Sequence, residues 1–193
     1  MDFSEVKNAS KAFGCTINDV MTCALSNSLA KYFEKRKDSH KRVNIMIPAN
    51  IRWEMYETFE EVRLENKFAP IPLTIPVEKD MLKTLSAVKR VTKQLKSQFA
   101  ITYCMYVLGI VTGMLLPGFV CSLIADKASL PYTLAFSNTP GILKPVSFGN
   151  VPSLGFHSYV IPGGRIGICI SVISYGGGFR LAMTADSSIM TKE

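Results

Sequence analysis

Residues 166–185 read IGICISVISYGGGFRLAMTA, and this stretch decides the fold class of the chain. Residues 166–174 are uncharged and rich in β-branched side chains, which predicts a buried strand. The three glycines at 176–178 tolerate the positive φ angles of a tight turn, and residues 179–185 supply a second strand. The C-terminal part of the chain is therefore expected to form a β-hairpin.

Further strands are expected earlier in the chain. They cover residues 43–47, 132–136, 146–148 and 156–160. The first is expected to end at Pro48, because a proline cannot donate to the hydrogen-bonding ladder. Residues 67–77 are apolar but carry three prolines, which predicts an extended segment at a sheet edge.

The N-terminal half of the chain is predicted to be mainly helical. Ser4 and Gly14 mark the start and the end of a first helix. Thr16 and Asp19 approximate a capping box, after which apolar residues recur at helical spacing. Residues 80–99 form the clearest helix, whose basic side is either an ordinary solvated face or a contact for phosphate or anionic lipid. Helices followed by strands in a mixed sheet predict an α/β or α+β layer architecture.

Residues 100–125 contain no charged side chain and exceed the roughly 20 residues that a membrane-spanning helix needs. Pro117 interrupts this run, and three glycines weaken it. We therefore expect one or two buried or interfacial helices rather than a true span. An integral membrane anchor is the alternative.

The composition narrows the classes of protein and partner. The 193 residues are expected to form one domain, residues 1–193. A formal charge of +7 suits an anionic partner, but no basic run interleaved with aromatic residues indicates nucleic-acid binding. The five scattered cysteines predict neither disulfides nor a metal site, which is typical of free thiols in a reducing, intracellular compartment.

No common catalytic fingerprint is present in the residues. The sequences of serine hydrolase, metalloprotease, P-loop and dinucleotide sites are absent. His40 lies in a charged loop and His157 in an expected strand, and neither has a companion at catalytic spacing. Residues 137–141 are expected to be a polar loop that follows the strand at 132–136 and presents hydroxyl, amide and backbone donors.

Five short motifs resemble, in the same order, those of the wax ester synthase/acyl-CoA:diacylglycerol acyltransferase family. TINDVM resembles the family's TVNDVVLA, and IMIPANIR is similar to its hVPVSLR strand. ENK followed by PL is similar to "GN…PLP", SNTPG resembles SNVPGP, and ISYGG followed by AD resembles SYxGxLxxGhxAD. The motifs occupy residues 16–21, 45–52, 65–73, 137–141 and 173–186.

The resemblance implies the C-terminal half of a two-domain fold like that of chloramphenicol acetyltransferase and condensation domains. In that superfamily an acyl thioester and an acceptor meet in a tunnel between the domains. The family's base is the second histidine of HHxxxDG in the N-terminal domain, and that motif is absent from this sequence. The resemblance therefore implies no catalytic residue in this chain, which alone should be inactive, and acyl-CoA as a substrate with no covalently bound cofactor.

The resemblance also implies which residues line the substrate tunnel. The tunnel candidates are Asn18, Asp19, Ser137, Asn138, Thr139, Gly141, Ser174 and Tyr175. Helix capping explains Asn18 and Asp19 equally well. Thr139 stands where the family usually has valine, and Ile142 replaces the final proline of SNVPGP. Arg52 is a candidate contact for a coenzyme A phosphate, with a surface salt bridge as the alternative.

The implied activity is transfer of a fatty acyl group from acyl-CoA to a long-chain alcohol or diacylglycerol. The alternative is an inactive homologue that serves as a structural or lipid-binding subunit of a larger membrane assembly. The expected partners are an N-terminal catalytic domain or another subunit, the lipid substrates, and a membrane or lipid-droplet surface with peripheral association.

Overall fold

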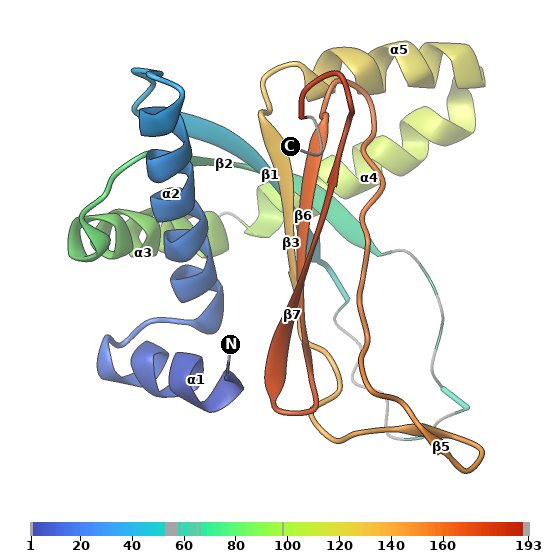
Figure 1. Cartoon of the computed structure of the whole chain (residues 1–193). Helices are drawn as coiled ribbons and strands as arrows, with labels where there is room; N and C mark the ends of the chain where they lie inside the picture. The colour runs from blue at the N-terminus through green and yellow to red at the C-terminus, as the bar shows by residue number, and fades with distance from the viewer. Residues whose placement is uncertain are drawn as a thin grey trace.

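A five-stranded mixed sheet forms the centre of the chain (Figure 1), with the strand order β2-β1-β3-β6-β7. The computed structural model describes residues 2–52, 58, 60–61, 63, 65, 67–97 and 99–190, with the side chains of Lys96 and Phe99 excepted. Strands β1, β3 and β6 run parallel, whereas β2 and β7 pair antiparallel at the two edges. This arrangement confirms the predicted mixed α/β architecture.

The elements follow one another from helices to strands. The helices are α1 (Phe3–Ala12), α2 (Ile17–Lys35), α3 (Met81–Ser97), α4 (Phe99–Leu115) and α5 (Gly118–Ser129). The strands of the main sheet are β1 (Arg42–Asn50), β2 (Phe68–Pro76), β3 (Leu134–Thr139), β6 (Ile168–Tyr175) and β7 (Gly178–Ala185). A small hairpin, β4 (Ser147–Phe148) with β5 (Val151–Pro152), lies outside that sheet.

Helices α1, α2 and α3 cover one face of the sheet and enclose the main core. Its fully buried members include Ile45, Leu73 and Leu134, one from each of three neighbouring strands. A smaller cluster of Ala135, Ile166 and Cys169 lies on the opposite face. The alternation of side chains along each strand separates these two clusters. Burial raises the pKa of the Cys169 thiol above its ordinary value.

The prolines of β2 all lie at positions that exchange no backbone hydrogen bond with β1. Pro70 and Pro72 lie opposite Pro48 and Met46. Backbone hydrogen bonds just beyond the two ends of the β1–β2 pair join Ile51 N to Lys67 O and Val77 N to Lys41 O. The odd-numbered residues of β2 are therefore the ones that bond to β1. The prolines therefore face the free edge, where they leave few donors for a further strand. The expected edge segment is confirmed.

Pro48 does not end its strand, contrary to expectation. Strand β1 continues to Asn50, because Pro48 lies at a position that exchanges no backbone hydrogen bond with β2, and the pairing of β1 with β3 on its other side ends at Met46. Residues 156–160, expected as a strand, instead form an extended coil. The hairpin turn at residues 176–178 is confirmed, with Gly176 at φ +57° and Gly177 at φ +81°.

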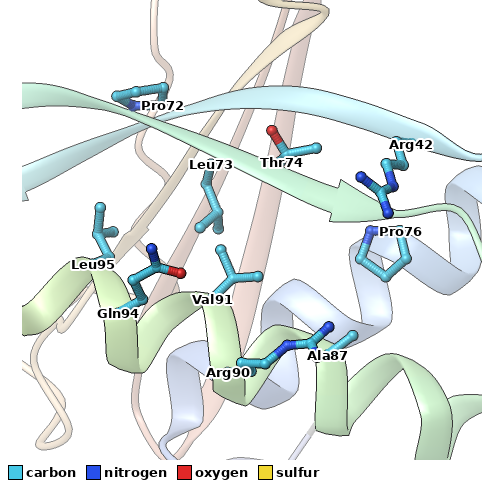
Figure 2. Close-up of a pocket in the computed structure, with 10 residues that line it drawn as sticks. All are labelled: Arg42, Pro72, Leu73, Thr74, Pro76, Ala87, Arg90, Val91, Gln94 and Leu95. Carbon is cyan, nitrogen blue, oxygen red and sulfur yellow. The ribbon is translucent and has the colours of Figure 1, made fainter.

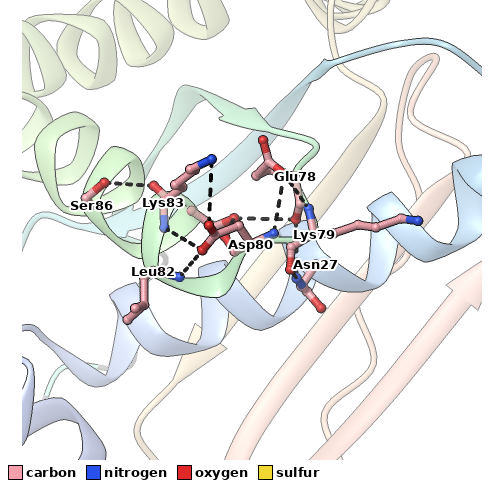
Figure 3. Close-up of polar contacts among 8 residues, drawn as sticks. Asn27, Glu78, Lys79, Asp80, Leu82, Lys83 and Ser86 are labelled. Carbon is pink, nitrogen blue, oxygen red and sulfur yellow. Dashed lines mark hydrogen bonds and ion pairs between the residues drawn. The ribbon is translucent and has the colours of Figure 1, made fainter.

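Side-chain caps fix the helix starts. Asp2, rather than Ser4, caps α1 by accepting from Ser4 N and Oγ at 2.6 and 2.7 Å. Asp80 caps α3 by accepting from the backbone N–H groups of Leu82 and Lys83 (Figure 3). The Asn27 side chain on α2 donates to the carbonyls of residues 78 and 79, which ties α2 to the turn before α3.

The charge-free segment forms two helices, α4 and α5, that meet at Pro117. Most of their large apolar side chains are exposed. Within the residues that the structure describes, no single helix has the length and hydropathy of a membrane span, although the bent pair of 81–95 and 100–115, at 62°, meets those criteria together.

Candidate functional site

The carboxyl ends of β1, β3 and β6 meet at one edge of the sheet, and the N-terminus of α2 lies beside them (Figure 1). We call this the carboxyl edge. Ligands of open α/β sheets bind outside the carboxyl ends of parallel strands. The motif residues at 18–19, 50–52, 137–141 and 174–175 all fall here, although they are far apart in sequence.

An asparagine pair joins two of these motifs. Strand β3 continues through Thr139, so residues 137–139 belong to the strand and not to the expected loop. Alternation along β3 directs Asn138 to the helix-covered face, two positions after the buried Phe136. There its side-chain Nδ2 donates to the Oδ1 of Asn18 at the start of α2.

Asp19 is buried and fully engaged beside this pair. Its Oδ2 accepts from the backbone N–H and the hydroxyl of Thr16, both at 2.8 Å, and Thr16 Oγ1 accepts from Asp19 N. Its Oδ1 accepts from the Thr92 hydroxyl on α3 at 2.7 Å. The capping box is confirmed, and it extends to a third element. Burial and the Asp19 carboxylate together raise the pKa of the Cys15 thiol.

Thr92 is the residue that sequence reasoning missed. It lies in the middle of the predicted helix at 80–99, and nothing in its local pattern distinguishes it from a solvated threonine. The same Oγ1 lies 3.0 Å from the Val88 carbonyl oxygen of its own helix, so its single proton is shared between that carbonyl and Asp19. Only the packing of α3 on α2 brings it to Asp19, so a single sequence carries no signal for this contact.

Gly141 and Ser174 bring the ends of β3 and β6 into close contact. The Gly141 backbone N–H donates to Ser174 Oγ at 2.9 Å. A Cβ at position 141 would lie 2.0 Å from the Ser174 carbonyl oxygen and 2.7 Å from Ile173 Cγ1. Only glycine fits at this position without a shift of the neighbouring strand.

Tyr175 anchors the segment that carries β4 and β5. Its buried ring places the hydroxyl where it donates to the Ser153 carbonyl at 2.9 Å and accepts from Val146 N at 3.2 Å. On the face of β3 opposite Asn138, the hydroxyls of Ser137 and Thr139 lie 3.3 Å apart. The carboxyl edge therefore presents hydroxyl and amide groups on both faces of the sheet.

Arg52 follows β1 at the same edge. Its Nη1 lies 3.4 Å from the Asn50 Oδ1, and its Nη2 donates to the Glu65 carbonyl oxygen. These contacts are hydrogen bonds to neutral acceptors, so the positive charge of Arg52 is not offset by a carboxylate in either of them. Asn66, the asparagine of the motif at 65–67, lies outside the described residues.

The histidines lie elsewhere. His40 precedes β1 at the opposite edge of the sheet, where it bonds to Asp38. His157 lies in the extended coil after β5, close to Gly155 and Arg180. Neither is among the groups gathered around Asn18 and Asn138.

A groove of about 360 Å³ runs between β2 and α3 (Figure 2). Its floor is apolar, with Leu73, Val91 and Leu95, and two arginines, Arg42 and Arg90, stand at one end of it. Arg42 on β1 and Arg90 on α3 make this end of the groove positively charged. The groove opens at the β2 edge of the sheet, so β1 separates it from β3 and the Asn138 pair.

A family model identifies the chain. The model of the WS/DGAT C-terminal domain matches residues 64–193. The chain belongs to this family of wax ester synthase/diacylglycerol acyltransferase C-terminal domains. The resemblance predicted from the motifs is confirmed, and the WS/DGAT domain is an acyltransferase-family domain. A sequence comparison with curated proteins gives no match.

Solved structures agree with the fold of the WS/DGAT domain. The chain is similar to the wax ester synthase/diacylglycerol acyltransferase from Marinobacter aquaeolei VT8, with a TM-score of 0.67, 13% identity, and coverage of 100% of this chain and 42% of that one. It is also similar to the first condensation domain of the CDA synthetase, with a TM-score of 0.56, 12% identity, and coverage of 97% and 38%.

A third similar structure concerns condensation-domain-mediated chain release from the enacyloxin polyketide synthase, with a TM-score of 0.59, 13% identity, and coverage of 99% and 35%. The WS/DGAT domain thus spans less than half the length of each of these three chains. The predicted fold, one half of a chloramphenicol acetyltransferase-like two-domain architecture, is confirmed.

Proposed function

We propose that this chain is the C-terminal half of an O-acyltransferase that moves a fatty acyl group from acyl-CoA to a long-chain alcohol or diacylglycerol. The observation that carries the proposal is the Asn138–Asn18 hydrogen bond. It joins two family motifs, 120 residues apart, at the sheet edge where ligands of α/β folds bind. Family membership and fold support the same reaction class.

The chemistry divides between two domains in this proposal. Acyl transfer needs a base for the acceptor hydroxyl and donors for the tetrahedral oxyanion. The base is the second histidine of HHxxxDG in an N-terminal domain. This chain supplies polar groups at the carboxyl edge, where Asn138 on one face of β3 positions the oxyanion, Ser137 on the other face contacts the acceptor, and Arg52 contacts a coenzyme A phosphate.

Exposed apolar side chains indicate where the N-terminal domain docks. Phe148, Leu154 and Ile161, on and after the β4–β5 hairpin, are 77%, 91% and 86% exposed. Tyr175 holds this segment at the carboxyl edge. An apolar surface of this kind is typical of an interface, so an N-terminal domain that covers it would close the tunnel over the carboxyl edge.

The Asn138→Ala substitution tests the proposal in the protein encoded by the complete gene. We expect kcat/KM for acyl transfer to fall roughly tenfold to a hundredfold, because a positioned donor is lost. Wax ester or triacylglycerol formation from labelled acyl-CoA measures it.

Asn8→Ala, on the exposed side of α1, is the matched control and should leave the rate unchanged. Equal rates for Asn138→Ala and Asn8→Ala would contradict the assigned role of Asn138. A complete protein that binds acyl lipids but forms no product would favour the inactive, lipid-binding subunit.

A further inference from the structure

Helices α4 and α5 form an apolar hairpin at the end of the sheet where β3 and β6 begin, opposite the carboxyl edge (Figure 1). Its base is fixed near the start of β6, where Arg165 N donates to Ser129 Oγ at 2.7 Å and Arg165 Nε contacts Asp126 Oδ1 at 3.0 Å. Between residues 100 and 125 there is no charge to interact with water or with a charged partner. The hairpin is thus a second apolar surface, separate from the proposed docking segment.

The exposed apolar side chains of α4 lie on opposite sides of the helix. Successive residues of a helix rotate by about 100°, so residues two apart differ by about 200°. Ile101, Met105 and Leu108 form one exposed stripe. The residues two positions later form the other stripe: Tyr103, Val107 and Ile110, extended by Met114. One flat protein surface covers one stripe only, whereas lipid surrounds both.

The tip of the hairpin is also apolar. Met114 and Leu115 before Pro117, and Phe119 after it, are 80%, 76% and 70% exposed. Charged residues resume only at the base, with Asp126 and Lys127 on α5. Apolar tips with polar groups confined to the base are typical of segments that enter the headgroup–acyl boundary of a bilayer.

We propose that the α4–α5 hairpin inserts into the surface of a phospholipid membrane and anchors the domain there. The hairpin lies at the opposite end of the sheet from the carboxyl edge (Figure 1). This inference does not rest on the acyl-transfer proposal, because it uses only the charge pattern and the exposure of α4 and α5.

Vesicle flotation with the 193-residue chain tests it. We expect the chain to float with phosphatidylcholine vesicles and to stay bound in 0.5 M NaCl, because apolar insertion is insensitive to salt. The double substitution Met114→Glu and Phe119→Glu should lower the partition coefficient at least roughly tenfold. Both side chains are exposed, so circular dichroism should show an unchanged fold.

The matched control replaces two equally exposed apolar residues outside the hairpin, Leu154→Glu with Ile161→Glu, and should retain binding. An equal loss in the control would overturn the assignment to the hairpin. Binding only to anionic vesicles, abolished by salt, would show that basic side chains and not the hairpin hold the chain to lipid. No flotation at all would also overturn the proposal.

Cys104 gives an independent readout. It is an exposed cysteine on α4, whereas Cys23 and Cys169 are buried. In a chain with Cys15→Ser and Cys121→Ser, a polarity-sensitive dye on Cys104 should shift its emission to shorter wavelength when phosphatidylcholine vesicles are added. The same dye on Leu154→Cys, in a chain that also carries Cys104→Ser, should not shift. The reverse pattern would contradict insertion of the hairpin.

Discussion

Replacing Asp19 with alanine is expected to lower the free energy of unfolding by about 3 kcal/mol, because the change removes a buried carboxylate that caps α2 and accepts a hydrogen bond from α3. The Thr16 backbone N–H and hydroxyl lose this acceptor, and the Thr92 hydroxyl keeps only carbonyls of its own helix. The bond from Thr92 joins the start of α2 to α3, so the effect extends beyond one cap. Urea unfolding followed by circular dichroism measures it.

Asp38→Ala is the matched control. Asp38 also accepts from a backbone N–H, that of His40, but in an exposed loop. Its replacement should change the free energy of unfolding by no more than about 0.5 kcal/mol, as is usual for surface sites. If Asp19→Ala costs no more than Asp38→Ala, the bonds at Asp19 do not hold α2 and α3 together.

Gly141→Ala is expected to destabilise the carboxyl edge by several kcal/mol, on the order of 3, because the new methyl group overlaps backbone atoms that cannot rotate away. The added Cβ would lie 2.0 Å from the Ser174 carbonyl oxygen. Strand β6 must shift, which breaks the bond from Gly141 N to Ser174 Oγ. Thermal unfolding measures the loss, and amide hydrogen exchange at residues 141 and 174–176 locates it.

Gly109→Ala is the matched control, because it makes the same substitution but is expected to stabilise the chain. Gly109 lies within α4, and no atom lies within 4 Å of a Cβ built there. Alanine is the better helix former, so this variant should be stabilised by about 0.5–1 kcal/mol. Similar destabilisation by both substitutions would show that the close approach of β3 and β6 is not what requires glycine at position 141.

Much of the fold could be predicted because its signals are local. The glycine turn at 176–178, the capping box at Thr16 and the proline edge strand each follow from a few adjacent residues. The prediction that Pro48 ends its strand was wrong because a strand tolerates a proline at a position that exchanges no hydrogen bond. The partner strands decide which positions those are. Residues 156–160 have a strand-like pattern but pair with no strand of the main sheet.

The candidate site was only partly predictable, and for a physical reason. The motifs named Asn18 and Asn138, but their hydrogen bond depends on the packing of α2 against β3. The expected loop at 137–141 is largely strand, because residues 137–139 pair in register with residues 171–173 of β6. Ser174 and Tyr175 were proposed for the tunnel, and their hydroxyls bond to Gly141, Val146 and Ser153. Their contact with substrate remains a prediction.

The most direct test of the proposed division of labour is an acyl-transfer assay on the purified 193-residue chain. With acyl-CoA and a long-chain alcohol or diacylglycerol, the chain alone should form no ester above the rate without protein. The protein from the complete gene should form it, and replacement of the second histidine of HHxxxDG by alanine should abolish the activity. Measurable wax ester or triacylglycerol synthesis by the chain alone would contradict the account.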